Sequence, residues 1–306
     1  MTAAGTRLDR PLFLPGEAST LFAVVSEPAS ATRSEGVMVL SGGGAVGCSG
    51  VNRLNVAVCR RLADRGWPAV RFDYRGVGDS TGTANRFRLD EPFANDVDVV
   101  SELMQSYGVR GFAAVGTCFG ARTAMAAGAA SSDCTGLVLC SVPVRDFEMG
   151  EAAAIRLARK LTIRQQIRKA LQPRVLRGLM KRYMRRRYLR VVRAKGRHLL
   201  RRLTGHVPED LQWVSERFLH ELDAVVTRRI PVLFVYDTKN DFYEDFQMAA
   251  RGRLGVILRH AEDRARVEVV DGSLHSSPTF RTQGACIDAI VRWFEGRVPV
   301  NVEVSR

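Results

Sequence analysis

Short apolar runs that alternate with helical patterns constrain the fold of this chain more than any other feature. The runs span residues 20–25, 37–40, 69–72, 111–115, 136–142, 232–236 and 267–270. From residue 37 onward most are continuously apolar, which is typical of strands buried on both faces of a parallel sheet. The helical patterns span residues 54–65, 96–107, 121–130 and 286–294. This alternation predicts a doubly wound, mostly parallel α/β sheet of about eight strands.

The first runs of the chain have no helical pattern between them. Strands joined without a crossover helix pair in an antiparallel way. We therefore expect an antiparallel hairpin at one edge of the sheet.

A long segment interrupts the alternation between Pro143 and Pro231. It is far longer than the dozen or so residues that a crossover between parallel strands needs. We expect one α/β core formed by residues 1–143 and 231–306, with residues 144–230 inserted as a helical lid. The best helical stretch is amphipathic, with an apolar face opposite a basic one. Its candidate substrate- and partner-binding residues are Leu179, Met180, Tyr183, Arg185, Arg186 and Arg187.

Positive charge is concentrated in this insert. The chain has 46 Lys and Arg against 32 Asp and Glu, a net charge of +14. Residues 156–202 hold 19 of the basic residues and no acidic one, so the remainder has a net charge of −5. A solvated lid face is one explanation, and an acidic partner or an anionic membrane surface is another. The chain has no nucleic-acid recognition motif, so nucleic acid is not an expected partner.

The six cysteines are scattered without CxxC pairs. The spacing therefore predicts neither a structural zinc site nor a disulfide framework. No apolar run approaches the roughly 18 residues that a membrane span needs. We expect a cytoplasmic protein with no metal and no cofactor, and contact with a membrane surface stays open.

A nucleophile elbow lies between one strand and one helix of this pattern. Residues 111–115 lead into Gly116-Thr117-Cys118-Phe119-Gly120, and a small-residue helical pattern follows. This is the Gly-x-nucleophile-x-Gly turn with Cys in place of Ser. Glycine is required on both sides, because the turn is tight and lies against a neighbouring strand and helix. An isolated Cys is more often a packing residue, so the context rather than Cys118 alone indicates chemistry.

Other catalytic parts follow in the order of an α/β hydrolase, which is nucleophile, acid and histidine. Asp241 lies after the strand at 232–236, and His275 follows the last strand. Asp237 and Asp146 are alternative acids. Ser41-Gly42-Gly43-Gly44 follows the strand at 37–40, where such enzymes place one oxyanion-hole amide, which either Gly43 or Gly44 supplies.

The block Arg71-Phe72-Asp73-Tyr74-Arg75-Gly76-Val77-Gly78-Asp79-Ser80, with the elbow, resembles the α/β-hydrolase superfamily over nearly the whole chain. It is most similar to the serine-aminopeptidase-type and exosortase-associated hydrolase branch. The resemblance implies the α/β-hydrolase fold, with Cys118 as nucleophile, Asp241 as orienting acid and His275 as base. Ser41 stands where many relatives have His, and Phe119 replaces a polar residue. We expect Asp73 and Arg75 to lock a loop rather than to react.

The expected mechanism follows from these parts. Cys118, beside His275 and at a helix N-terminus, is expected to be partly thiolate and to attack an acyl carbonyl. The backbone N–H groups of Gly43 and Phe119 would hold the oxyanion. His275 relays the proton and Asp241 holds its tautomer.

Three functions fit these features. The first is a thioesterase or acyltransferase that takes an acyl group from an acyl thioester on coenzyme A or an acyl carrier protein, both of which are acidic. The second is an ester or lipid hydrolase at a membrane surface. The third is a binding protein with a degenerate site. The acyl chain, the acceptor, the oligomeric state and the pathway stay open.

Overall fold

One eight-stranded sheet organises the part of the chain that the computed structural model describes, which is residues 7–16, 19–30, 33–43, 46–83, 88–146, 214–274 and 278–297. The strands are β1 (Leu8–Pro15), β2 (Thr20–Glu27), β3 (Glu35–Leu40), β4 (Ala69–Phe72), β5 (Gly111–Thr117), β6 (Cys134–Cys140), β7 (Val232–Asp237) and β8 (Ala265–Val270). The α-helices are α1 (Leu54–Ala63), α2 (Ala94–Ser106), α3 (Phe119–Ala130), α8 (Glu216–Thr227), α9 (Asp241–Ala249), α10 (Arg253–Ala261) and α11 (Phe280–Gly296). Two short 3-10 helices, η1 (Val51–Arg53) and η2 (Glu262–Arg264), complete the described elements.

The strand order is β1-β2-β4-β3-β5-β6-β7-β8. The six strands from β4 to β8 in this order run parallel, whereas β2 pairs with β4 in an antiparallel way. Strands β4, β6 and β7 are buried along their whole length. This burial explains their continuous apolar runs. The predicted doubly wound, mostly parallel sheet of eight strands is confirmed.

The N-terminal hairpin consists of β1 and β2, which pair in an antiparallel way from Leu8–Glu27 to Pro15–Thr20. The expected edge hairpin is therefore present. Its first strand is absent from the apolar runs of the sequence, because Asp9, Arg10 and Pro11 interrupt it. Edge strands tolerate charges and proline, since one side of their backbone needs no partner.

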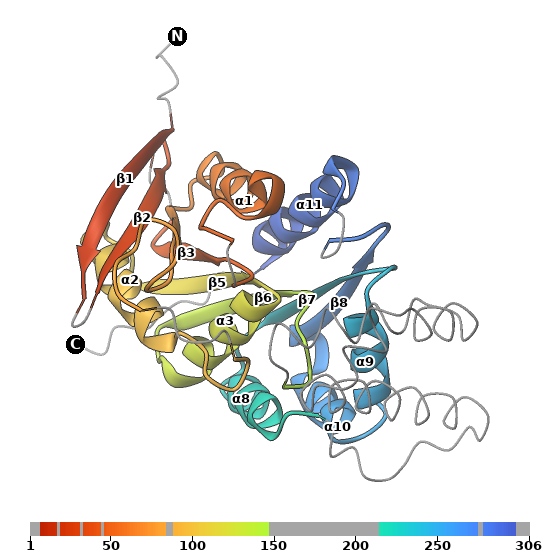
Figure 1. Ribbon diagram of the computed structural model, residues 1–306. Helices are drawn as coiled ribbons and strands as arrows, with labels where there is room; N and C mark the ends of the chain where they lie inside the picture. Colours follow the sequence, from red (N-terminus) through yellow and green to blue (C-terminus); the bar gives the residue numbers. More distant parts are fainter. Residues whose placement is uncertain are drawn as a thin grey trace, which may run out of the picture. The chain divides into compact units, whose positions relative to one another are not determined.

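Helices cover both faces of the sheet (Figure 1). Helices α1 and α11 lie together on one face, while α2, α3 and α8 lie on the other. Under α1 and α11, the Trp67 and Phe294 rings meet edge to face with centroids 5.6 Å apart. The aliphatic residues around them come from β3, β5, β6 and β7, so burial of this layer joins the first and last thirds of the chain.

Helix α8 lies within residues 144–230, where the sequence predicts a lid. Ser215 caps it by accepting a hydrogen bond from the Phe218 N–H at 3.2 Å. Its apolar side, including Phe218, Leu222 and Val225, is buried. Helix α8 packs against α3 and α10. Residues 147–213 of that range, which include the predicted amphipathic stretch, lie outside the described residues.

The carboxyl ends of the parallel strands meet at one edge of the sheet. In open α/β sheets this is the edge where ligands bind. Cys118 follows β5 directly, and its N–H donates to the Cys140 carbonyl at the end of β6 at 2.8 Å. The loops after β3, β7 and β8 end at the same edge and carry the other predicted site residues.

Candidate active site

Cys118 occupies a strained turn between β5 and α3. Its backbone has φ 52° and ψ −109°, a conformation that side-chain-bearing residues rarely adopt. Such a residue costs of order 1–3 kcal/mol and persists only where its surroundings hold it. Here the Cys118 carbonyl accepts from the Ala121 and Arg122 N–H groups, which begin the helix. The predicted elbow is therefore present.

The two flanking glycines are required by backbone contacts. A Cβ on Gly116 would lie 2.2 Å from the Gly120 carbonyl oxygen. A Cβ on Gly120 would lie 2.4 Å from the Ser41 oxygen and 2.6 Å from the Leu40 oxygen. These distances are too short for any side chain. The ends of β3, β5 and α3 thus meet backbone to backbone at the elbow.

The helix that begins directly after Cys118 favours an anion at this position. Cys118 is buried and directly precedes α3, where helix N–H groups lack partners within the helix and the helix dipole favours negative charge. Burial raises the pKa of Cys48, Cys59 and Cys134 to about 12. None of the six cysteines forms a disulfide.

The loop after β3 lies against the elbow. A Cβ on Gly42 would lie 3.9 Å from the Cys118 Cβ and 3.4 Å from the Thr117 oxygen. Gly43 is buried with φ 78°, a conformation that favours glycine. The structure therefore brings Gly42 close to Thr117 and Cys118. Gly44 lies outside the described residues, and the oxyanion-hole assignment to Gly43 and Phe119 stays a prediction.

Phe119 belongs to an aromatic cluster beneath the elbow. Its ring meets those of Tyr74 and Phe93 with centroids 5.9 Å and 5.6 Å away. Tyr74 and Phe93 stack at 5.0 Å, and the Tyr74 hydroxyl donates to the Ser41 carbonyl at 3.3 Å. An apolar residue at position 119 is explained by this packing.

Asp237 faces the loop that carries His275. It is the last residue of β7 and is fully buried. Its Oδ2 accepts from the Leu274 N–H at 3.0 Å, and its Oδ1 accepts from the Lys239 N–H at 3.1 Å. Burial raises the pKa of this carboxyl. His275 itself lies outside the described residues, but Asp237 contacts the residue directly before it.

Asp241 and Asp146 lie elsewhere around the edge. Asp241 is the first residue of α9 and is half-buried, next to the Asn240 side chain that caps the helix. Its predicted contact with His275 involves a residue outside the described part and stays a prediction. Asp146 pairs with Arg122, with an Nη2–Oδ1 distance of 3.0 Å.

The predicted loop lock is confirmed. Asp73 accepts hydrogen bonds from the Cys48 and Asp79 N–H groups. Arg75 donates from Nε to Asp96 at 2.7 Å. Asp73 thereby joins the loop after β4 to the loop after β3, close to the candidate oxyanion amides.

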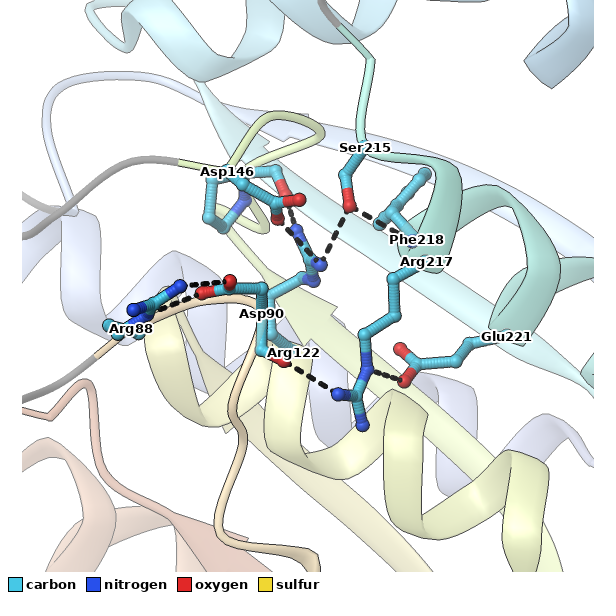
Figure 2. Close-up of polar contacts among 9 residues, drawn as sticks. Arg88, Asp90, Arg122, Asp146, Ser215, Arg217, Phe218 and Glu221 are labelled. Carbon is cyan, nitrogen blue, oxygen red and sulfur yellow. Dashed lines mark hydrogen bonds and ion pairs between the residues drawn. The ribbon is translucent and has the colours of Figure 1, made fainter. Parts of the chain in front are cut away.

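Arg122 and Asn52 are two residues near the site that the sequence interpretation missed. Arg122 is fully buried one turn after Cys118 (Figure 2). It is the single charged residue in a helix of small and apolar residues, and this contrast is a signal that the sequence offers. Asn52, with φ 49°, donates from Nδ2 to the Pro278 carbonyl at 3.1 Å, which ties η1 to the chain after His275.

The residues predicted to bind substrate or a partner belong to the inserted segment. Leu179, Met180, Tyr183, Arg185, Arg186 and Arg187 all lie outside the described residues. Within the described ranges, His, Cys, Asp and Glu side chains form no group of three that could hold a metal ion. None of the described helices is both long and apolar enough to cross a membrane.

Comparisons with known proteins agree with this geometry. A family model described as alpha/beta hydrolase fold matches residues 37–249. No curated protein sequence matches the chain. An esterase from Pyrococcus furiosus has a similar structure, with a TM-score of 0.60 and 14% identity over 94% of this chain and 91% of that one. A proline iminopeptidase from Mycobacterium smegmatis has a TM-score of 0.55 and 18% identity over 93% and 97% of the two chains.

A thioesterase domain from the curacin biosynthetic pathway is also similar, with a TM-score of 0.53 and 16% identity over 93% of this chain and 99% of that one. Likeness at such low identity shows the fold alone. The neighbours include an esterase, a peptidase and a thioesterase, so the fold does not select the substrate.

Proposed function

This chain belongs to the α/β hydrolase family, and we propose that it is an enzyme that transfers acyl groups through a covalent intermediate on Cys118. We further propose that it acts as a thioesterase or acyltransferase on carrier-bound acyl thioesters. The observation that supports this proposal most is the backbone of Cys118, held at φ 52° between two glycines that no other residue can replace. Strain of this kind concentrates at reacting groups.

The proposed reaction uses the thiolate of Cys118 as nucleophile. Its sulfur forms a bond to the acyl carbon, and the bond from that carbon to the sulfur of the donor breaks. The departing thiolate takes a proton from protonated His275, while the amides of Phe119 and Gly43 hold the oxyanion. Water or another acceptor then releases the acyl group. Because one thioester replaces another, the first step is nearly thermoneutral, which suits a cysteine.

The turn between β7 and α9 is proposed to supply the acid that orients His275. Asp241 is the acid that the resemblance implies. Asp237 is the alternative, supported by its hydrogen bond to the Leu274 N–H and by its complete burial. A buried carboxylate beside an imidazole stabilises the imidazolium and selects its tautomer.

An acidic carrier is the proposed donor because of the charge distribution. Residues 156–202 carry 19 basic and no acidic residues, whereas the rest of the chain is net negative. Complementary charge mainly raises the association rate and weakens with salt, since the screening length is about 8 Å near 0.15 M. Replacing Arg185, Arg186 and Arg187 by Glu is expected to raise KM for a carrier-bound donor, with a small uncharged thioester unaffected. Salt-sensitive binding of the protein to anionic liposomes instead would favour the membrane hydrolase.

Intact-protein mass spectrometry tests the central claim. Wild-type protein incubated with a panel of acyl thioesters is expected to gain one acyl mass, located on Cys118. Cys118→Ala is expected to gain none and to stay folded, while Cys118→Ser is expected to react much more slowly. The thiols of Cys48, Cys59 and Cys134 serve as internal controls, because their raised pKa keeps them protonated at neutral pH. A folded wild type that gains no acyl group from any donor would favour the binding protein.

A further inference from the structure

Arg122 is a buried charge that the proposed chemistry does not use. Its relative exposure is 0%, and its backbone N–H donates to the Cys118 carbonyl at 3.3 Å, so it belongs to the same helical turn as the nucleophile. Removing a guanidinium from water costs several kcal/mol unless partners replace the water. The partners of Arg122 therefore indicate why an arginine is present in this helix.

These partners come from the described segments on either side of residues 147–213 (Figure 2). On one side, Nη1 donates to the Pro143 carbonyl at 3.3 Å and Nη2 pairs with Asp146 at 3.0 Å. On the other side, Nη2 donates to the Ser215 hydroxyl at 3.1 Å. The planar guanidinium presents its donors in a rigid fork that is wide enough to reach all three partners. A lysine ammonium has three donors, but they all lie on one nitrogen atom.

The two ends also contact each other. The Ser215 N–H donates to the Val144 carbonyl at 2.9 Å. We call Pro143–Asp146 together with Val214 and Ser215 the neck. It begins three residues after Cys140, whose carbonyl accepts from the Cys118 N–H. The neck therefore lies at the carboxyl edge of the sheet, next to the elbow.

Charged residues of α8 and of the loop between β4 and α2 lie near this contact (Figure 2). The guanidinium carbon of Arg122 lies 5.5 Å from the Phe218 ring centroid. Glu221 bonds Arg217 Nε at 2.6 Å, and Arg217 Nη1 donates to the Asp90 carbonyl at 2.6 Å. Apolar packing already joins α3 to α8, so attachment of these helices does not need a buried charge. The donors of Arg122 point instead to the neck.

We propose that Arg122 is a positioning residue, which fixes the neck against the Cys118 turn so that the acyl donor meets the thiol in one geometry. The effect on the donor rests on the proposed function. The contact between the neck and the Cys118 turn does not depend on the proposed function, because it is a property of the fold. Loss of the contact is expected to weaken donor binding more than the chemical step, since the guanidinium partners named above, Pro143, Asp146 and Ser215, all belong to the neck.

The test uses the full chain and three variants of the contact. Arg122→Lys keeps the charge but not the fork. Asp146→Asn removes one partner of Arg122, and Ser215→Ala removes another together with the N-cap of α8. Arg228→Lys is the matched control, because Arg228 Nη1 donates to the Gly128 carbonyl at the far end of α3, at 2.9 Å. Amide hydrogen exchange at Ser215 and steady-state KM and kcat with one acyl thioester are measured for each protein.

Arg122→Lys is expected to speed exchange at Ser215 and to raise KM by about tenfold each, equivalent to about 1.4 kcal/mol, with kcat nearly unchanged. Ser215→Ala and Asp146→Asn are expected to show the same changes to a smaller extent, and they carry the test if Arg122→Lys does not fold. Arg228→Lys is expected to change neither quantity.

A lower melting temperature in Arg122→Lys, with exchange and KM as in Arg228→Lys, would overturn the proposal and leave Arg122 as a core residue. If wild-type Cys118 accepts no acyl group, the proposed function fails, and exchange at Ser215 still decides whether Arg122 holds the neck. Unchanged exchange in all three variants overturns the positioning role whatever the activity.

Discussion

The carboxyl and amino edges of the sheet differ in how their buried polar side chains are paired. At the carboxyl edge, Cys118 and Ser141 both have positive φ, and the buried Ser141 hydroxyl has no hydrogen-bond partner among the described residues. The Asp237 carboxyl there is fully buried, and its pKa is raised. The carboxyl edge therefore holds the strained Cys118 turn and buried polar groups, which is typical of a functional site. Positive φ also occurs at the amino edge, at Arg229 before β7 and at Glu262 before β8.

At the amino edge, polar groups pair around Glu35, although the buried Arg297 Nε has no hydrogen-bond partner among the described residues. Glu35 at the start of β3 accepts from Trp67 Nε1 at 3.1 Å and from Thr135. Arg297, at the end of α11, pairs with Glu35, donates to the Thr135 carbonyl at 2.9 Å and lies 4.5 Å from the Trp293 ring centroid. We call Glu35, Trp67, Thr135 and Arg297 the amino-edge cluster. The amino-edge cluster is therefore expected to contribute to stability, whereas the carboxyl edge carries the proposed site.

The largest expected effect comes from removing both the thiol and the strain. Cys118→Gly is expected to abolish acylation and also to raise the free energy of unfolding by about 1 kcal/mol, because glycine adopts this backbone conformation at little cost. Cys118→Ala loses acylation equally but keeps the strain. Intact mass and urea denaturation measure the two effects. Equal stability of the two variants would contradict strain at the elbow.

The acid of the site gives the next largest effect. Asp237→Asn is expected to slow acylation by roughly 10²–10⁴-fold, because an amide does not stabilise the imidazolium. Since burial raises the pKa of Asp237, the wild-type rate is expected to fall as the pH drops through a value above the ordinary aspartate range. Asp241→Asn is the matched variant, and pH–rate profiles compare the two. A larger loss in Asp241→Asn would assign the acid to Asp241.

The amino-edge cluster is expected to affect stability alone. Glu35→Gln leaves the Arg297 guanidinium without its carboxylate and is expected to lower the free energy of unfolding by about 2 kcal/mol. Acylation of Cys118 per folded molecule is expected to stay at the wild-type rate. Urea denaturation and burst kinetics measure these quantities. Slower acylation in folded Glu35→Gln would show that the two edges are coupled.

The smallest effect is expected for a single hydrogen bond of the same cluster. Trp67→Phe removes the Nε1 donor to Glu35 and keeps an aromatic ring against Phe294, so a loss of about 1 kcal/mol is expected. Thermal melting detects a change of this size. Unaltered stability would mean that Arg297 and Thr135 satisfy Glu35 without Trp67.

Local patterns predicted much of this molecule. Apolar runs located seven of the eight strands, and most of these are strands of the parallel sheet that are buried on both faces. Strand β1 was not predicted, because charged residues and Pro11 interrupt its apolar pattern. An edge strand tolerates such residues. The elbow was predictable because its strand, two glycines and helix are consecutive. The sequence did not decide which residue is the acid that orients His275, since Asp237 and Asp241 both lie near the end of one strand. The hydrogen bond from the Leu274 N–H to Asp237 is visible only in the structure.

The sequence by itself determined the doubly wound sheet and the place of Cys118 between Gly116 and Gly120, since both depend on residues that are close along the chain. Only the tertiary structure decided that Arg122 is buried against Ser215, which is 93 positions away, and that Asp237 faces Leu274, which is 37 positions away. Hydrogen bonds between distant segments form after the sheet has brought those segments together. No local pattern of residue types encodes which donor then meets which acceptor.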